Sequence, residues 1–129
     1  MARKKSPTLT DAELQVIRVL WRLGSCTVRE LVQAQNRTPP LSYSSVATIL
    51  KILHKKGHVR YETVGRSFRY FPVLDEEEAA SDAVSYVVSR FFKNSSKQLV
   101  LNVLASEGID STELERLERL IESHEGNRS

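Results

Sequence analysis

Apolar residues recur with helical spacing between Ser42 and Gly57, the most regular stretch of the chain. Four of them follow the i, i+3, i+4, i+7 pattern of one helix face: Val46, Ile49, Leu50 and Leu53. Ser42 is a favourable N-cap and Gly57 a typical helix end, so the pattern predicts a helix between these two residues. The opposite face carries small hydroxyl groups first and lysines later: Ser44, Ser45, Ala47, Thr48, Lys51 and Lys55.

Two shorter helices are predicted before this one, because each begins with a capping box, in which a cap residue and the third helical residue exchange hydrogen bonds. Thr10 with Glu13 fits the first box, and Thr27 with Glu30 fits the second. Apolar pairs flank both boxes at the positions of a hydrophobic staple, namely Leu9 with Leu14, and Cys26 with Leu31. We therefore expect the single cysteine to be a packing residue rather than a reactive thiol.

After the predicted third helix, the apolar pattern changes to the twofold period of β-strands. The runs Val59–Val64 and Phe68–Phe71 are separated by Gly65-Arg66-Ser67, which predicts a β-hairpin with Gly65 in the turn. Three helices followed by a hairpin are typical of a winged helix-turn-helix, whose third helix enters the major groove while the hairpin, or wing, contacts the flanking backbone. Basic residues of the wing and its base are the candidate phosphate contacts: Lys55, Lys56, Arg60, Arg66 and Arg69.

The polar face of the third predicted helix suits DNA recognition. Small side chains let a helix lie deep in the groove, and hydroxyl groups can reach phosphates or base edges. The methyl groups of Ala47 and Thr48 suit the thymine methyl. An ordinary solvent-facing helix surface has a similar composition, so this face alone leaves both interpretations open.

Three more helices are predicted in the second half, beginning near Asp75, Ser96 and Asp110, with a polar tail after Glu122. Three short helices bury too little apolar surface to be stable alone, so we expect a second copy of the segment to cover them. The candidate core or interface residues, which the sequence does not separate into these two roles, are Val84, Val88, Phe91, Leu99, Val103, Leu117 and Leu120. The chain is thus predicted to be mainly α-helical, with a winged-helix domain at residues 1–74 and a helical dimerisation domain at residues 75–129.

Charge is divided unequally between the two predicted domains. Residues 1–74 hold 13 Lys and Arg against 4 Asp and Glu, whereas residues 75–129 hold 6 against 12. The basic half is expected to bind a polyanion such as double-stranded DNA, which the acidic half would repel. Residues 1–8 form a basic arm that either lies along the DNA or is a plain disordered tail.

Other classes of protein are disfavoured. The 129-residue chain has one cysteine, no apolar run of membrane-spanning length and no signal peptide, so a cytoplasmic protein without membrane contact is expected. His54, His58 and His124 lie in no catalytic or metal-binding motif, and neither an enzyme nor a metal or cofactor site is expected. His58, beside a helix end, is expected to cap that helix or contact a phosphate. The remaining alternative is a winged-helix module that binds protein instead of DNA, and the basic first half argues against it.

Three segments together resemble the penicillinase repressors and methicillin-resistance repressors, with their copper-transport relatives. The segments are Leu9–Trp21, Leu41–Gly57 and Lys97–Val103, and the resemblance extends over residues 8–122. It implies a homodimeric repressor with an N-terminal winged helix, which binds an inverted-repeat DNA operator, and a C-terminal dimerisation segment. The chain lacks the Cys-x-Cys pair of the copper-responsive members, so copper sensing is not implied.

The resemblance also implies a mode of release. In the antibiotic-responsive members, a membrane sensor protease cuts the repressor within its dimerisation segment, and the matching bond here is Asn102–Val103. The family pattern has an aromatic residue where this chain has Val103. A cut at this bond would split a predicted helix and weaken the dimer, so that two weakly binding monomers would replace one bivalent repressor.

Overall fold

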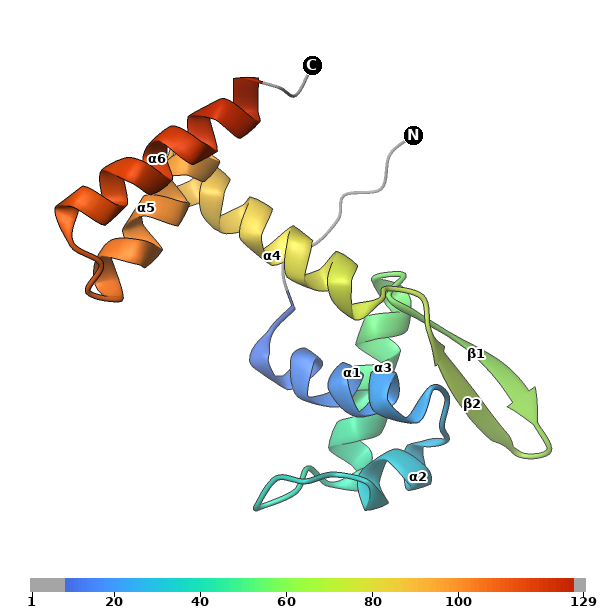
Figure 1. The fold of residues 1–129 in the computed structure, drawn as a ribbon. Helices are drawn as coiled ribbons and strands as arrows, with labels where there is room; N and C mark the ends of the chain where they lie inside the picture. The colour runs from blue at the N-terminus through green and yellow to red at the C-terminus, as the bar shows by residue number, and fades with distance from the viewer. Residues whose placement is uncertain (1–8, 127–129) are drawn as a thin grey trace. The chain divides into compact units, whose positions relative to one another are not determined.

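The computed structural model of the chain describes residues 9–126 and is mainly helical, with one two-stranded antiparallel sheet (Figure 1). In chain order the elements are α1 (Asp11–Leu23), α2 (Val28–Gln33), α3 (Tyr43–Lys55), β1 (Val59–Val64), β2 (Ser67–Pro72), α4 (Glu76–Phe91), α5 (Ser96–Ser106) and α6 (Ser111–Gly126). This order confirms the predicted fold class of three helices, a hairpin and three further helices. The basic arm predicted at residues 1–8 lies outside the described residues.

Local hydrogen bonds explain where α1 and α2 begin. The Glu13 N–H donates to the Thr10 hydroxyl at 3.1 Å, and the Thr10 N–H donates to the Glu13 carboxylate at 2.9 Å. Thr27 and Glu30 repeat this exchange, with both distances at 3.1 Å. Both predicted capping boxes are therefore confirmed.

The wing ends in a two-residue turn. β1 and β2 pair in an antiparallel register that places Val64 opposite Ser67. Ser67, predicted to lie in the turn, is therefore the first residue of β2, and only Gly65 and Arg66 connect the strands. Gly65 adopts a φ of 62°, a conformation that a two-residue hairpin turn requires and that glycine adopts without strain.

The wing is joined to the helices through its second strand. The Cys26 N–H donates to the Tyr70 carbonyl at 3.1 Å, and the Tyr70 N–H donates to the Cys26 carbonyl at 2.7 Å. Both side chains are buried, which confirms the packing role predicted for Cys26. Burial, and next the negative charge of Glu30, raises the pKa of the Cys26 thiol to about 11, so the thiol is protonated at neutral pH.

The described chain divides into two compact units that meet between Ala83 and Val84, inside α4. The N-terminal unit has a core drawn from α1, α2, α3, the wing and the loops between them: Val16, Ile17, Val19, Leu20, Cys26, Leu31, Val46, Leu50, Leu53, Val59, Tyr70 and Leu74. The chain entering α4 is attached to this core, because the Trp21 indole N–H donates to the Leu74 carbonyl at 2.8 Å. The division therefore lies beyond Asp75, where the sequence suggests a domain boundary.

The C-terminal unit has few buried side chains of its own. Its helices α5 and α6 lie side by side (Figure 1), and the Lys97 ammonium group pairs with Glu122 at 2.9 Å and with Glu118 at 3.4 Å. Between residues 84 and 123, only Val88 is buried. The core of this unit is therefore too small to stabilise the fold of the unit by itself.

The sixth helix continues to Gly126, whereas the sequence predicts a polar tail after Glu122. Residues 123–125 contain neither glycine nor proline, so the helix continues until the next glycine. Within the described residues, no helix is long and apolar enough to cross a membrane.

Candidate nucleic-acid interface

The polar face of α3 is exposed because the opposite face is fixed in the core. Val46, Leu50 and Leu53 have no exposed surface. The predicted recognition residues of α3 comprise one half-buried residue, Ala47, and five exposed ones: Ser44, Ser45, Thr48, Lys51 and Lys55. A shallow, open depression lined by Ser44, Ser45, Thr48 and Ile49 marks the first turns of this face. The helix thus presents its small polar side chains to solvent.

Three serines cluster at the start of α3. The Ser45 N–H donates to the Ser42 hydroxyl at 3.1 Å, which confirms Ser42 as the N-cap. The Ser42 oxygen also lies 3.0 Å from the Ser45 hydroxyl and 3.3 Å from that of Ser44. Because a hydroxyl group can rotate between donating and accepting, this cluster can exchange its internal bonds for bonds to a phosphate or a base edge.

Two further residues of α3, outside the predicted recognition set, are also exposed. Ile52 is 41% exposed and Tyr43, the first residue of the helix, is 57% exposed. Ile52 follows Thr48 by four residues, a spacing that places both on the same helix face. That spacing is visible in the sequence, but an apolar residue on a polar face is easily assigned to the core. An exposed isoleucine could contact a thymine methyl group.

The predicted phosphate contacts differ in whether another side chain of the protein already binds them. Lys55, at the end of α3, and Arg66, in the wing turn, are exposed and form no ion pair with the described residues. Arg60 lies over the Phe71 ring at 4.2 Å from its centroid and donates to the Glu62 carboxylate at 2.9 Å. This exposed pair contributes little free energy, so a phosphate could replace Glu62.

Lys56 is bound within the N-terminal unit. Its ammonium group donates to the carboxylate of Glu13, which is buried, at 2.7 Å. Burial alone would raise the pKa of the Glu13 carboxyl, but hydrogen bonds from Lys56 and Thr10, together with the Lys56 charge, lower it below its usual value. Phosphate contact by Lys56 stays a prediction, and the residue would have to share its charge with Glu13.

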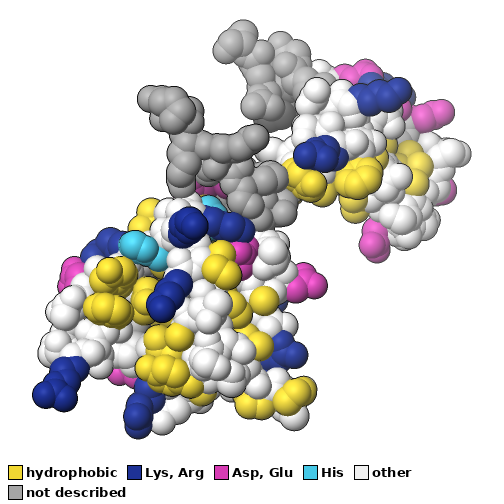
Figure 2. Space-filling model, turned by 180° about the vertical axis from the view of Figure 1, so that it is seen from behind, with side chains coloured by type: hydrophobic (Ala, Val, Ile, Leu, Met, Phe, Trp, Pro, Cys, Tyr) yellow, Lys and Arg dark blue, Asp and Glu magenta, His cyan; other side chains and the backbone are white. Residues whose placement is uncertain are grey.

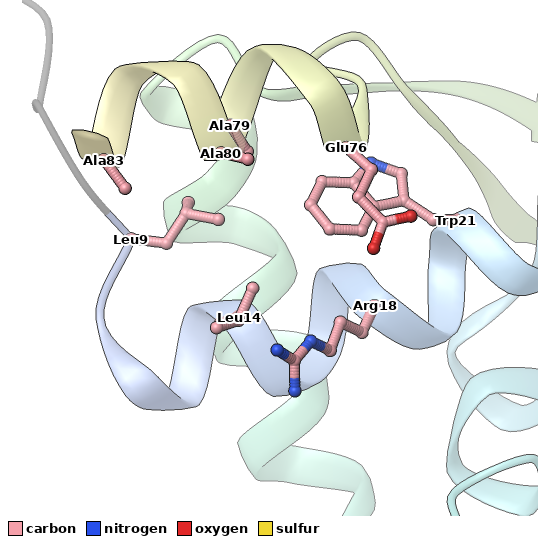
Figure 3. A pocket seen from close by; sticks show the side chains of 8 residues that line it. All are labelled: Leu9, Leu14, Arg18, Trp21, Glu76, Ala79, Ala80 and Ala83. Carbon is pink, nitrogen blue, oxygen red and sulfur yellow. The ribbon is translucent and has the colours of Figure 1, made fainter. Parts of the chain in front are cut away.

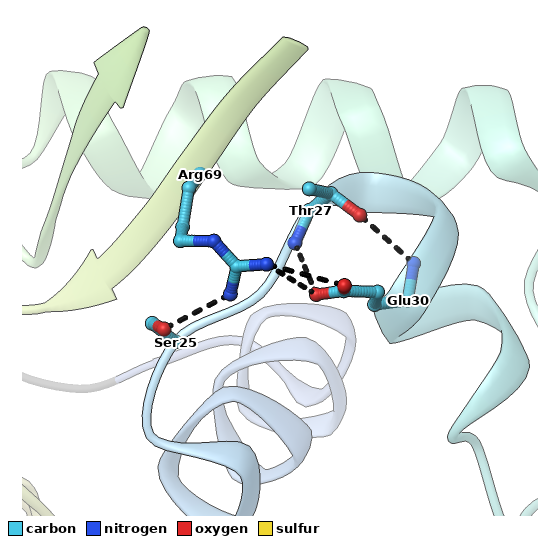
Figure 4. A network of polar contacts seen from close by, with 4 residues as sticks. All are labelled: Ser25, Thr27, Glu30 and Arg69. Carbon is cyan, nitrogen blue, oxygen red and sulfur yellow. Dashed lines mark hydrogen bonds and ion pairs between the residues drawn. The ribbon is translucent and has the colours of Figure 1, made fainter. Parts of the chain in front are cut away.

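Arg69 belongs to a polar network at the start of α2 (Figure 4). Its Nη2 lies 3.2 Å from both carboxylate oxygens of Glu30, and its Nη1 donates to the Ser25 hydroxyl at 3.0 Å. The same Glu30 carboxylate accepts from the Thr27 N–H in the capping box. The side chain of Arg69 therefore connects β2 to α2, and its contact with a phosphate stays a prediction.

Both histidines near the end of α3 have partners in the chain. The His58 N–H donates to the Leu53 carbonyl at 2.9 Å, so the predicted capping is made by the backbone. The His58 side chain is 4% exposed, and this burial contradicts the alternative of a phosphate contact. The His54 ring lies 4.9 Å from the Tyr61 ring, which lies 4.5 Å from that of Phe68. These aromatic contacts attach the wing to α3.

A cavity of about 220 Å³ lies between α1 and the start of α4 (Figure 3). Its lining consists of Leu9, Leu14, Arg18, Trp21, Glu76, Ala79, Ala80 and Ala83. Most of these side chains are apolar, and the staple pair Leu9 and Leu14 forms part of the wall. We therefore interpret the cavity as a packing gap under the staple and not as a catalytic site.

The predicted subunit-contact residues of the C-terminal unit differ in exposure. Val88 is buried, Leu99 and Leu117 are half-buried, and the exposed ones are Val84, Phe91, Val103 and Leu120. Figure 2 shows apolar side chains gathered on the surface of this unit. Asn102, which precedes Val103 in α5, is also exposed. Unlike the sequence, the structure distinguishes the side chains that a partner could reach from those that fill the unit.

Comparison with known proteins agrees with this architecture. A family model described as penicillinase repressor matches residues 9–123. The penicillinase repressor of Bacillus licheniformis is 30% identical over 125 residues, which cover 97% of this chain and 98% of that protein. The methicillin resistance regulatory protein MecI of Staphylococcus aureus (strain N315) is 20% identical over 117 residues, which cover 91% of this chain and 95% of that protein.

The N-terminal unit also has a relative among solved structures. A solution structure of the DNA-binding domain of the repressor BlaI is similar with a TM-score of 0.51 and 36% sequence identity. The similarity covers 59% of this chain and 93% of that domain. The chain therefore belongs to the penicillinase repressor family, whose members are transcriptional repressors and not enzymes.

Proposed function

We propose that the chain represses transcription as a homodimer, with α3 of each subunit in the major groove of an inverted-repeat operator. The observation that carries this proposal is the exposed polar face of α3. Its side chains are small at the start of the helix and cationic at the end, and the buried apolar face fixes their direction. Such a helix can approach base edges closely while its lysines neutralise phosphates.

Each part of the interface has its own role. Ser44, Ser45 and Thr48 read base edges by hydrogen bonds, and Ala47 contacts a thymine methyl group. Lys51 belongs to the same reading face. The phosphate contacts, which hold the wing and the end of α3 on the backbone without reading sequence, are Lys55, Arg60 and Arg66.

A second copy of the chain is the partner that the C-terminal unit fits. Its exposed apolar side chains include Phe91, of which 73% is exposed, together with Val84, Val103 and Leu120. A homodimer would cover this surface and relate two recognition helices by a twofold axis, which requires an operator with the same symmetry. Joining two weak DNA contacts in one molecule would raise the affinity through effective concentration.

Cleavage between Asn102 and Val103 by a membrane sensor protease is the mode of release that we propose with it. The bond lies inside α5, where the Asn102 carbonyl accepts from the Ser106 hydroxyl at 3.0 Å. A protease needs an extended substrate, so this part of α5 must unwind before it is cut. The test is intact-mass measurement of the protein in its native host after exposure to a cell-wall antibiotic. Derepression with the chain left whole would exclude cleavage.

Two measurements test DNA binding itself. Titration into random duplex DNA at two salt concentrations should give a steep loss of affinity with salt, because bound phosphates release counterions. Selection of bound sequences from a random duplex pool should then return two half-sites in inverted orientation. A winged-helix module that binds protein instead would give a weak, salt-insensitive response and no selected sequence.

A further inference from the structure

We propose that Arg69 and Glu30 form a latch that fixes the direction of the wing, and that Arg69 acts on DNA binding through this latch rather than by contacting a phosphate. The inference rests on the proposed DNA-binding function. It assigns to Arg69 a positioning role, and it gives Glu30, an acidic residue in a basic unit, a favourable effect on DNA affinity.

The latch is built from three contacts that use both terminal nitrogens of one guanidinium group (Figure 4). Two of them join Nη2 to the carboxylate oxygens of Glu30 at 3.2 Å, and the third joins Nη1 to the Ser25 hydroxyl at 3.0 Å. Glu30 is itself held in place, because its carboxylate accepts from the Thr27 N–H in the capping box. Arg69 thus grips a group whose position the start of α2 determines.

The latch and the core hold opposite faces of the hairpin. Successive residues of a strand point to opposite sides, so Arg69 and Tyr70 lie on different faces of β2. Tyr70 is buried on one face, with its ring 5.7 Å from that of Tyr61, and Tyr61 contacts His54 of α3. On the other face, Arg69 reaches α2. Because both faces are attached, the latch reduces the freedom of the wing to swing about the Cys26–Tyr70 bridge.

Neighbouring charges support this assignment. Glu62 is the cross-strand partner of Arg69, but its carboxylate pairs with Arg60 at 2.9 Å. Arg69 therefore pairs with Glu30, whose negative charge offsets the positive charge of the guanidinium group. A guanidinium group paired in this way has little free charge for a phosphate, and the adjacent carboxylate would repel one.

The test uses the full chain and compares two variants that each replace a glutamate by glutamine. If only net charge mattered, both would increase the affinity for DNA. Glu30→Gln keeps the capping box, since glutamine also serves at that position, but removes the charge that holds Arg69. Glu62→Gln removes a negative charge from the wing itself and leaves the latch intact. We expect Glu30→Gln to weaken DNA binding about two- to five-fold per wing, the factor of a partly exposed ion pair. We expect Glu62→Gln to leave affinity unchanged or to increase it.

Salt dependence separates positioning from phosphate contact. If Arg69 acts through the latch, both Glu30→Gln and Arg69→Met should lower the affinity for DNA without changing the slope of log affinity against log salt. A phosphate contact by Arg69 would instead make Arg69→Met lower that slope by about one, and Glu30→Gln would tighten binding. Arg69→Lys retains the charge but cannot form the two-nitrogen grip, so the latch predicts weakened binding for this variant also.

Amide hydrogen exchange of the DNA-free protein tests the latch independently of DNA. Glu30→Gln and Arg69→Met should speed exchange in β1 and β2, while Glu62→Gln should not. Unchanged exchange in all three variants, or wild-type affinity in Arg69→Lys, would overturn the latch. A wild-type chain that binds no duplex DNA would instead overturn the proposed function, and the exchange experiment would still decide whether the latch exists.

Discussion

Glu13 connects two parts of the N-terminal unit through a single carboxylate. It closes the capping box of α1 and accepts from Lys56 at the end of α3. Its own hydrogen bonds and the Lys56 charge lower its pKa despite the opposing effect of burial. A residue that looks like an ordinary capping glutamate thus also positions the end of the recognition helix against α1.

This pair should give the protein an acid-sensitive contribution to stability. The pKa of the Glu13 carboxyl is lower in the folded than in the unfolded chain, so its ionised form stabilises the fold. This stabilisation is fully present at a pH above the pKa of the unfolded chain, and it is lost as the pH falls through the pKa of the folded chain. We expect Glu13→Gln, which can keep the capping box, to lower the free energy of unfolding at pH 7 by about 1–3 kcal/mol. The difference should shrink as the pH falls below 4.5, the ordinary pKa of a glutamate carboxyl.

Urea unfolding of both proteins at neutral and acidic pH measures this difference. Glu77→Gln, at an exposed position of α4 in the same unit, is the matched control and should show no comparable pH dependence. A difference between wild type and Glu13→Gln that stays constant through the acidic range would contradict the assignment of the lowered pKa to the folded state.

Thr48 tests the recognition face at the same scale. An acidic residue at this exposed position would meet the phosphates and base edges of the groove, so Thr48→Glu should reduce operator binding about a thousandfold or more, towards the non-specific level. Thermal unfolding should change little, because the side chain is outside the core. Ser81→Glu, which adds the same charge at an exposed position of α4, is the control in a gel-shift titration. Retained operator affinity in Thr48→Glu would refute α3 as the reading helix.

Among the elements, those determined by neighbouring residues were predictable from the sequence. The capping boxes start α1 and α2, and the change of apolar period separates α3 from the wing. The partners of Lys56 and Arg69 were not predictable, because they join residues 43 and 39 positions apart. Only the folded arrangement brings a carboxylate to each cation, so a basic residue that looks free in the sequence can already be paired.

In the wing turn, Arg66 forms no ion pair with the described residues. Arg66→Ala should therefore weaken binding to operator and random duplex about equally and lower the salt slope by about one per subunit. Arg116→Ala, on α6 with an exposed side chain paired to Glu113, should leave the slope unchanged. Fluorescence titrations at several salt concentrations give these slopes. A loss confined to one sequence would mean that Arg66 reads a base or the groove width.

At the scale of the whole molecule, the two units differ in how much apolar surface each buries in a core of its own. Both units expose some large apolar side chains, but the N-terminal unit has a core of twelve buried residues, whereas only Val88 is buried between residues 84 and 123. Sequence periodicity identified these side chains but could not assign them to core or interface, because both surroundings select the same residues. The position of the division within α4 was also hidden, since the helix continues across it.

The small core of the C-terminal unit predicts that the chain forms a dimer. Val103→Glu should weaken self-association about tenfold or more, because it places a charge on a surface that the dimer would cover. Gln98→Glu adds the same charge to an exposed polar position of α5 and should leave the dimer intact. Sedimentation of the full chains at micromolar concentration distinguishes them. A wild-type chain that sediments as a monomer would contradict the proposed dimer.

Burial of Cys26 makes the native thiol a reporter of unfolding. It is the single cysteine of the chain, has no exposed surface and has a pKa raised to about 11, so a thiol-specific reagent at neutral pH reaches it only when the N-terminal unit opens. The rate of its modification therefore measures that opening, and bound DNA should slow it. A second cysteine placed on the wing turn would react far faster, so a fluorescent or spin label can be attached there without removing the native residue.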